Sequence, residues 1–407
     1  MNHSTEKDGF VYISYDKVMS SSPNNSYVVA DDMILNNNMP TTAGSKMLDG
    51  YQSLLEAEAL TRAKSAGYAL CGKADVGEFS FDLLGETSYR GALVEDGVLK
   101  NASAEIVASG DAIAALCLDV NGAPRRAAAQ YGLVSVKPTY GRVSRYGTVP
   151  VTCSGETVSV LAKTASGCRA LLDAIAGHDD KDGTSLPSEL CNKVSEAAPV
   201  RRVALLKSFK ADTAVTAKID AAAKEFKSNG IEVIEIDNEL FAAARAAWNV
   251  LMCAELCNNV SRYDGVKYGY RAENFSGIDE LYTNSRTEAF GELLKTAILF
   301  GSETLSTENY MKVYDKCLRT RRVICEEFAK IFSDFDALLL PACSTLTYTE
   351  KAIKDNKHLA FEENLYTAPA SITGLPAVVA GGVQLIGKAF SENALLDAAK
   401  ILTKEAN

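Results

Sequence analysis

The sequence predicts a single α/β domain with a mixed central sheet and helices on both of its faces. Apolar strand patterns alternate with helical patterns along most of the 407 residues, and no repeat or low-complexity linker divides the chain. Residues 200–206 and 230–236 have strand patterns on either side of a helical pattern at 213–228, and such a unit places its two strands in parallel. We expect residues 1–27 to be an irregular N-terminal segment and residues 28–407 to form the domain.

The remaining elements follow from the spacing of apolar residues and from turn residues between them. We expect helices at residues 52–67, 102–108, 111–116, 164–176, 248–257 and 310–332, and strands at 68–71, 116–119, 133–136 and 336–341. Within the N-terminal segment, only Gly9–Met19 has a faint strand and helix pattern.

The composition is typical of a globular chain that makes no membrane contact. Apolar residues make up 47% of the sequence and charged residues 23%. No apolar run is long enough to span a bilayer, and the first residues lack the basic start and apolar core of a signal peptide. We therefore expect a cytoplasmic protein. The formal net charge of −10 argues against direct binding of nucleic acid.

The sequence predicts no cofactor and no metal site. The ten cysteines include no C-x-x-C pair, and the closest two, Cys253 and Cys257, lie one helical turn apart like small core residues. The three histidines, His3, His178 and His358, have no spacing that suits a metal ion. Neither a zinc site nor a Cys–His catalytic pair is expected.

One string carries the most specific signal in the chain. Residues 137–147 read KPTYGRVSRYG and follow GVLKNASAEIVASGDAIAALCLDVNGAPRRAAAQYGLVSV at residues 97–136. These motifs resemble the amidase-signature family, most closely its A subunits of tRNA-dependent amidotransferases. The strings SRYDGVKYGYR at 261–271 and ELYTNSRTEAFG at 280–291 support the same resemblance. It covers nearly the whole chain after residue 27 and implies the fold of that family.

The resemblance implies amide hydrolysis by a Ser–Ser–Lys relay, in which a lysine accepts a proton through one serine so that a second serine attacks. The alignment of motifs places Asp31 at the lysine, Leu99 at the bridging serine and Ala123 at the nucleophile. Alanine has no oxygen to attack with, leucine cannot pass a proton, and aspartate reverses the charge of the lysine. We therefore expect no intact catalytic group at these positions.

The loop that supplies the oxyanion hole in the family aligns with Val120, Asn121 and Gly122. Two interpretations stay open for it: an anion-binding turn that has lost its nucleophile, or a plain strand–turn–helix corner. The family positions that bind the substrate correspond to Arg321 for its carboxylate, Asn364 in place of an aspartate for its ammonium group, and Tyr270.

Asp31 and Asp32 offer an alternative acid–base pair. Adjacent residues on a strand point to opposite faces, however, so a solvated turn is the better interpretation of these two carboxylates. Lys73 matches a family lysine that is not the catalytic one, and we expect it to lie beside a carboxylate as a structural residue.

These observations predict a non-catalytic scaffold or regulatory protein that works beside the B and C subunits of a tRNA-dependent amidotransferase. Two alternatives stay open. One is an active amidotransferase A subunit or amidase that releases ammonia from glutamine. The other is a binding protein in which Arg321 holds a small-molecule carboxylate. A fold resemblance alone does not decide between them.

Overall fold

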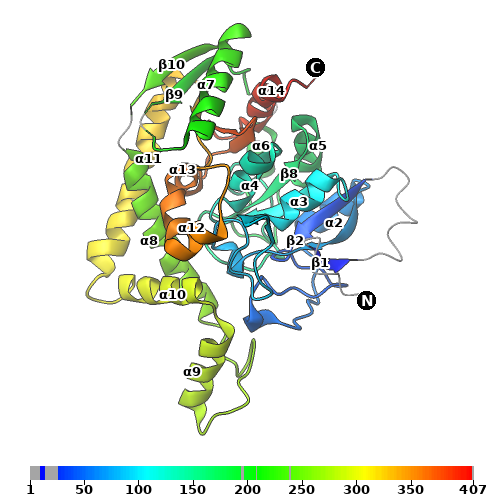
Figure 1. Ribbon diagram of the computed structural model, residues 1–407, viewed down its shortest axis with the longest axis vertical. Coiled ribbons are helices and arrows are strands. Elements are labelled where there is room, and N and C mark those ends of the chain that lie inside the picture. The colour runs from blue at the N-terminus through cyan, green and yellow to red at the C-terminus, as the bar shows by residue number, and fades with distance from the viewer. Residues whose placement is uncertain (1–9, 14–25, 194–196, 208, 238–239, 406–407) are drawn as a thin grey trace.

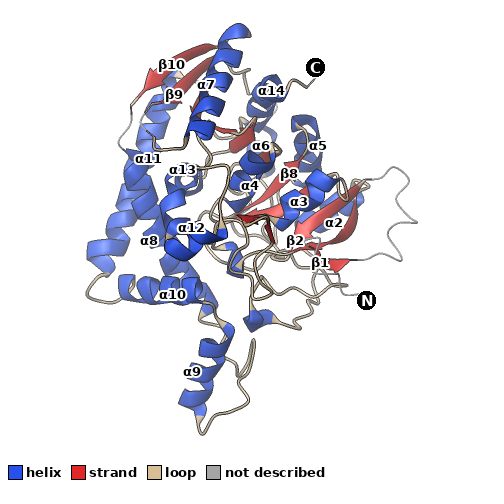
Figure 2. Cartoon of the chain, viewed as in Figure 1, coloured by secondary structure: helices blue, strands red, loops and turns tan. Residues whose placement is uncertain are grey.

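The computed structural model describes residues 10–13, 26–193, 197–207, 209–237 and 240–405. Within these ranges, eleven strands form one mixed sheet, and helices lie on both of its faces (Figures 1 and 2). The predicted fold class is therefore confirmed. No helix of the described ranges is long and apolar enough to cross a membrane.

The strand order across the sheet is β1-β3-β2-β6-β8-β7-β12-β13-β11-β9-β10. β2 pairs in parallel with β3 and β6, β9 pairs in parallel with β10 and β11, and all other neighbours are antiparallel. The predicted parallel pair is thus confirmed as β9 and β10. The strands are β1 (Phe10–Ile13), β2 (Tyr27–Asp31), β3 (Ala69–Ala74), β6 (Ala114–Asp119), β7 (Val134–Lys137), β8 (Thr157–Ala162), β9 (Arg202–Leu206), β10 (Glu232–Ile236), β11 (Ala337–Leu340), β12 (Ala377–Ala380) and β13 (Val383–Gly387).

The helices and short helical turns connect and cover these strands. They are η1 (Lys46–Leu48), α2 (Glu58–Ser65), η2 (Glu78–Ser80), α3 (Ala102–Ser109), α4 (Ala123–Tyr131), α5 (Ala165–Ile175), α6 (Ser188–Cys191), α7 (Thr213–Ser228), α8 (Leu240–Val260), α9 (Ile278–Ala289), α10 (Glu292–Thr304), η4 (Tyr310–Tyr314), α11 (Asp315–Asp334), α12 (Glu350–Asp355), α13 (Leu359–Thr373) and α14 (Glu392–Thr403). A separate hairpin joins β4 (Val94–Glu95) to β5 (Val98–Leu99).

The side chains of β6 show how the core is divided. Ala115 and Cys117 belong to the apolar cluster that includes α3 and α4, whereas Leu116 and Leu118 belong to the cluster that includes α2 and α5. Successive side chains of a strand point to opposite faces, so both faces of β6 are buried under helices. Such a strand presents an apolar residue at nearly every position.

Several expected elements differ in their bounds; for example, the helix expected at 248–257 is the longer α8, and the helix expected at 310–332 is divided into η4 and α11. The helix expected from residue 52 begins at Glu58, because the Ala57 N–H is bonded to the Leu35 carbonyl and residues 51–57 form a loop. The helix expected at 111–116 does not form, since Gly110, with a φ of 95°, ends α3 before β6 begins. Residues 10–13 form β1, a strand inside the segment expected to be irregular, and the helical pattern after it lies outside the described residues.

One part of the chain stands apart from the body of the molecule. α9 and the loop before it, at residues 264–277, project beyond α10 (Figure 1). The buried face of α9 carries Leu281, Ser285 and Ala289. The string at 261–271 begins this projection, and Tyr270 Oη donates to Glu288 Oε2 on α9 at 2.6 Å, so the two amidotransferase-like strings are neighbours in space as well as in sequence.

Candidate functional site

Asp31 and Ala123 line one small cavity. Asp31 ends β2, and Ala123 is the first residue of α4, which begins after Gly122 with Pro124 in its first turn. The cavity has a volume of about 10 Å³, and Ser80 also lines it. A cavity of ~10–15 Å³ holds about one water molecule. The structure therefore brings two of the three aligned catalytic positions together, around a space of minimal size.

Leu99 is not among the residues that line this cavity. Its side chain is fully buried in the apolar cluster of α3 and α4. Its N–H donates to the Tyr348 carbonyl at 2.8 Å, and its carbonyl accepts from Gln130 Nε2 at 2.8 Å. Leu84 belongs to the same cluster and does line the cavity. At position 99, then, an apolar side chain packs where the resemblance implies a serine.

Asp31 joins three elements of the fold. Its Oδ1 accepts from Ser103 Oγ at 2.5 Å on α3, and its Oδ2 accepts from the Leu118 N–H at 3.1 Å on β6. Burial raises the pKa of Asp31 to about 6, although the hydrogen bond from Ser103 opposes this shift. The expectation of a solvated turn is wrong for both carboxylates, because Asp31 and Asp32 are buried.

Asp32 has a different set of partners from Asp31. Its Oδ1 lies 2.8 Å from Lys73 Nζ on β3, and both side chains are fully buried. The Lys73 amine also donates to Thr41 Oγ1 at 2.6 Å and to the Pro40 carbonyl at 3.1 Å. Burial lowers the pKa of Lys73, and the nearby charge of Asp32 opposes that shift. The two carboxylates therefore do not share a site, and the Lys73 amine is already engaged.

Arg125 is the centre of a buried network at the corner between β6 and α4. Its Nε and Nη2 donate to the two carboxylate oxygens of Asp119, at 2.8 and 2.9 Å. Its remaining bonds reach the Thr367 carbonyl, Ser371 Oγ and Gln384 Oε1, on α13 and β13. Burial alone would raise the pKa of Asp119, but the charge and hydrogen bonds of Arg125, together with the charges of Lys137 and Arg126, outweigh it and hold that pKa below its ordinary value. Sequence reasoning missed this network, because its partners lie far apart in the chain.

The aligned oxyanion loop is packed against α13. Val120 is buried in the core, and Asn121 donates through Nδ2 to the Phe81 carbonyl at 3.1 Å. Thr367 Oγ1 donates to the Asn121 carbonyl at 3.2 Å. Gly122 has a φ of 86°, and a Cβ there would lie 2.4 Å from Thr367 Cγ2. Glycine is thus required at this turn both by its conformation and by the close approach of α13.

Residues 80–87 close the cavity from the other side. Asp82 lines it and accepts from the N–H and Oγ1 of Thr87, both at 2.8 Å. Burial and, after it, the charge of Glu86 raise the pKa of Asp82 well above its ordinary value. Arg126 donates to the carbonyls of Asp82 and Leu83, each at 3.2 Å. Asp82 belongs to none of the sequence motifs, so the sequence did not indicate that it lines this cavity.

The three aligned substrate-binding residues do not border this cavity. Arg321 on α11 donates to the Ser154 carbonyl at 3.0 Å. Asn364 on α13 is fully buried and donates to Asn249 Oδ1 at 2.7 Å. Tyr270 donates to Glu288 Oε2 at 2.6 Å and lines a different cavity. The structure therefore does not assemble them around Asp31 and Ala123.

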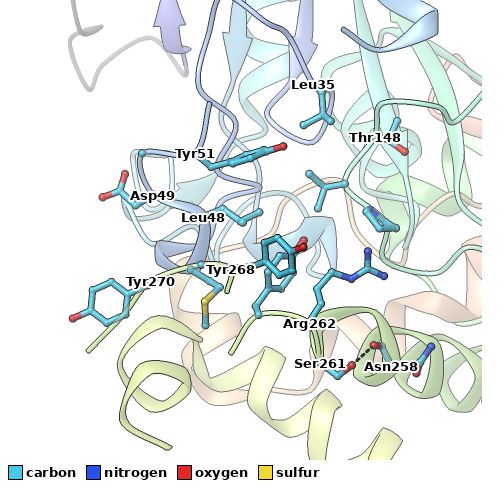
Figure 3. Close-up of a pocket in the computed structure, with 16 residues that line it drawn as sticks. Leu35, Leu48, Asp49, Tyr51, Thr148, Asn258, Ser261, Arg262, Tyr268 and Tyr270 are labelled. Atoms are coloured by element: carbon cyan, nitrogen blue, oxygen red, sulfur yellow. Dashed lines mark hydrogen bonds between the residues drawn. The ribbon is translucent and has the colours of Figure 1, made fainter. Parts of the chain in front are cut away.

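That second cavity is far larger, with a volume of about 830 Å³ (Figure 3). Its wall contains part of the string at 261–271, including Arg262, Tyr263 and Tyr268. The sequence analysis singled out this string but predicted no ligand pocket beside it. The other walls of the pocket come from residues far away in the sequence. Among the described residues, no group of three or more His, Cys, Asp or Glu side chains is placed to hold a metal ion.

Comparison with known proteins agrees with the motifs. The protein-family model described as Amidase matches residues 31–396. The A subunit of the glutamyl-tRNA(Gln) amidotransferase of Streptococcus pneumoniae (strain Hungary19A-6) is 34% identical over 409 residues, which covers 95% of this chain and 83% of that protein. The protein of the same name from Acinetobacter baumannii (strain AB0057) is 34% identical over 390 residues, with coverage of 90% and 79%.

Solved structures show the same relationship. The A subunit of the glutamyl-tRNA(Gln) amidotransferase from Thermotoga maritima has a TM-score of 0.77 and 26% identity, and the match covers 93% of this chain and 83% of that one. 6-Aminohexanoate cyclic dimer hydrolase shares the fold, with a TM-score of 0.78 at 18% identity and coverage of 97% and 89%. The resemblance seen in the motifs is confirmed, and the chain belongs to the amidase family.

Proposed function

We propose that the chain is a non-catalytic member of the amidase family and acts as a scaffold or regulatory subunit. Its partners would be equivalent to the B and C subunits of a tRNA-dependent amidotransferase. The observation that carries this proposal is the cavity of about 10 Å³ that Asp31 and Ala123 line. Sites for small organic ligands ordinarily measure about 300–1,000 Å³. An amide substrate does not fit a space for one water.

The side chains around this cavity also lack the groups of the relay. Ala123 offers no oxygen, and Asp31 offers a carboxylate that is bonded to Ser103 and Leu118. Residues of such a relay act as a unit, so the loss of one removes most of the rate. Asp82 and Leu84 line the cavity, and the space that these walls enclose has no room for a substrate.

Other nucleophiles near the cavity are poorly placed to replace the missing serine. Ser103 is 1% exposed and does not line the cavity. Ser80 does line it, but no base in the described ranges accepts a hydrogen bond from its hydroxyl. Cys117 lines it as well, and burial raises the pKa of its thiol well above the ordinary value. A thiol in that state is not a nucleophile near neutral pH.

The role as a subunit is supported by the relatives and by the projecting helix. The proteins named above from Streptococcus pneumoniae, Acinetobacter baumannii and Thermotoga maritima are each called one subunit of an amidotransferase, and the match to the first covers 95% of this chain. On α9, Ile278 and Tyr282 are 53% and 38% exposed at positions i and i+4, so they share one side of the helix. Phe275, just before α9, is 40% exposed. Apolar side chains gathered on a projecting element are typical of a contact surface.

Co-expression with the B and C subunits of the host, followed by size-exclusion chromatography, tests this role. We expect the chain to co-elute with at least one of them and Ile278→Asp to weaken the complex. Leu299→Asp is the matched control, because Leu299 is 72% exposed on α10. A chain that unfolds cooperatively yet elutes alone would contradict the scaffold role. A cytoplasmic location without direct nucleic-acid contact is part of the same proposal.

A further inference from the structure

The larger cavity has the dimensions of a ligand pocket. Its volume of about 830 Å³ lies between residues 47–51, the turn at 148–150 and residues 258–270 (Figure 3). Pockets for small molecules measure about 300–1,000 Å³ and combine apolar walls with a few polar groups. The two cavities share no lining residue, so this pocket is separate from the aligned catalytic positions.

Arg262 supplies a positive charge that no carboxylate of the described residues neutralises. Its Nε donates to the Asn259 carbonyl at 2.8 Å, and its Nη2 donates to Asn259 Oδ1 at 3.1 Å. These bonds fix the guanidinium at the end of α8. A guanidinium has five N–H donors, so further donors are available to a ligand. Arg125, by contrast, is fully engaged with a carboxylate and three other acceptors.

Three tyrosine hydroxyls also line the pocket without a hydrogen-bond partner in the described part of the chain. They belong to Tyr51, Tyr263 and Tyr268. Figure 3 shows Tyr51, Tyr268 and Arg262 around the same space, with Leu35 and Thr148 on its far side. Burial raises the pKa of Tyr263 to about 12, so its hydroxyl is a donor at neutral pH.

The walls of this pocket are held in place by a backbone hydrogen bond, a close glycine contact and an aromatic contact. The Tyr270 N–H donates to the Met47 carbonyl at 2.8 Å, and a Cβ on Gly269 would lie 2.4 Å from Met47 Sδ. The Tyr263 ring packs 5.7 Å from the Phe79 ring, between centroids. The string at 261–271 is therefore locked against η1 and η2. A pocket formed before binding loses less entropy when its ligand enters.

We propose that this pocket binds a small organic monocarboxylate with a flat or apolar body. The guanidinium of Arg262 and the tyrosine hydroxyls would hold the carboxylate, and Leu35 and Val149 would contact the body. Among the described lining residues the one carboxylate is Asp49, which accepts from Tyr89 Oη at 2.8 Å and lies at the edge of the pocket (Figure 3). Arg262 is the single cation among the described residues that line the pocket, so the pocket suits a monoanion better than a phosphate dianion.

Ligand-observed NMR and isothermal titration with the full chain test this assignment. The probes are benzoate, phenylacetate, 4-hydroxyphenylacetate and octanoate, each paired with its neutral primary amide. We expect at least one acid to bind about fivefold more tightly than its amide, or better. Arg262→Gln should remove that preference. Arg271→Gln is the matched control, since Arg271 is an exposed arginine of the same string that does not line the pocket.

Tyr268→Phe provides a second variant that does not depend on the stability of the Arg262 variant, because Tyr268 is 61% exposed. We expect it to weaken the preferred acid by about twofold or more. Equal binding of acid and amide would overturn the assignment. So would an affinity that Arg262→Gln leaves unchanged, or no detectable binding of any acid at about 5 mM. None of these outcomes depends on amide hydrolysis or on partner subunits.

Discussion

The corner at residues 119–126 and the string at 261–271 are both family motifs, yet their polar groups are used in opposite ways. At the corner, Arg125 is fully buried and bonded to Asp119, and the adjoining cavity measures about 10 Å³. In the string, Arg262 is exposed, its guanidinium bonds only to Asn259 among the described residues, and it faces a space of about 830 Å³. The first region has become part of the core, whereas the second presents polar groups to a ligand.

This contrast distinguishes two reasons for which a chain retains a family motif. Residues of the corner are required by packing, because α13 lies directly against the turn at Gly122. Residues of the string also pack, through Tyr263 and Gly269, but Arg262 and Tyr268 are exposed. Substitutions in the two regions should therefore differ in their effect on stability.

The largest difference in unfolding free energy is expected between variants of the two arginines, Arg125 and Arg262. Arg125→Met leaves the Asp119 carboxylate buried without its partner, which costs about 3–5 kcal/mol of unfolding free energy. Arg262→Met removes two hydrogen bonds at the surface and should cost about 1 kcal/mol or less. Urea denaturation of both variants, monitored by circular dichroism, measures the difference. Similar losses in the two variants would contradict the contrast.

The second comparison concerns two glycines with positive φ. Gly122→Ala places a methyl group 2.4 Å from Thr367 Cγ2 at a φ of 86°, and we expect a loss of about 3 kcal/mol. Gly97, with a φ of 75°, has no atom within 4 Å of the added Cβ. Gly97→Ala should therefore cost only the conformational strain, about 1 kcal/mol. Equal losses, measured by the same denaturation, would show that α13 does not restrict the corner.

The smallest expected effect concerns how the stability of the chain depends on pH through the protonation of Asp31. Its pKa is about 6 in the folded chain against an ordinary value of 3.8, so the folded state favours the protonated form. The contribution of Asp31 to stability is complete below pH 4 and is lost as the pH rises through 6. Asp31→Asn should remove this loss and stabilise the chain by about 2 kcal/mol at pH 8.

At pH 4 the same variant should differ little from the parent, because the carboxyl group of the parent is then protonated. Denaturation curves at several pH values give the comparison directly. A stability difference that does not change between pH 4 and pH 8 would mean that Asp31 is not the titrating group. The assignment of a raised pKa to burial would then be wrong.

The sequence predicted the fold class and the parallel pair β9–β10, because strand and helix periodicities and family motifs depend on residues close in the chain. The motifs also placed Asp31 and Ala123 in one neighbourhood, and the cavity they line agrees with that. The burial of Asp31 was not predicted, since it depends on Ser103 and on the Leu118 N–H of another strand.

Two further features could not be read from the sequence, for the same physical reason. Asp82 lines the cavity, and Thr87 and Arg126 hold its segment in place through hydrogen bonds. The pocket beside Arg262 needs walls from residues 35–51 and 148–150, more than a hundred positions away. Long-range contacts of this kind leave no periodic pattern in the sequence.

Ammonia release from glutamine tests the central claim most directly. Purified chain, alone and mixed with the B and C subunits of the host, should release no more ammonia than the solvent background. Asparagine and an aryl amide should give the same result. Ser80→Ala, Ser103→Ala and Ser154→Ala serve as controls for an unrecognised nucleophile. Turnover that follows the protein through purification and is lost in one of these variants would show that a working nucleophile remains and contradict the account.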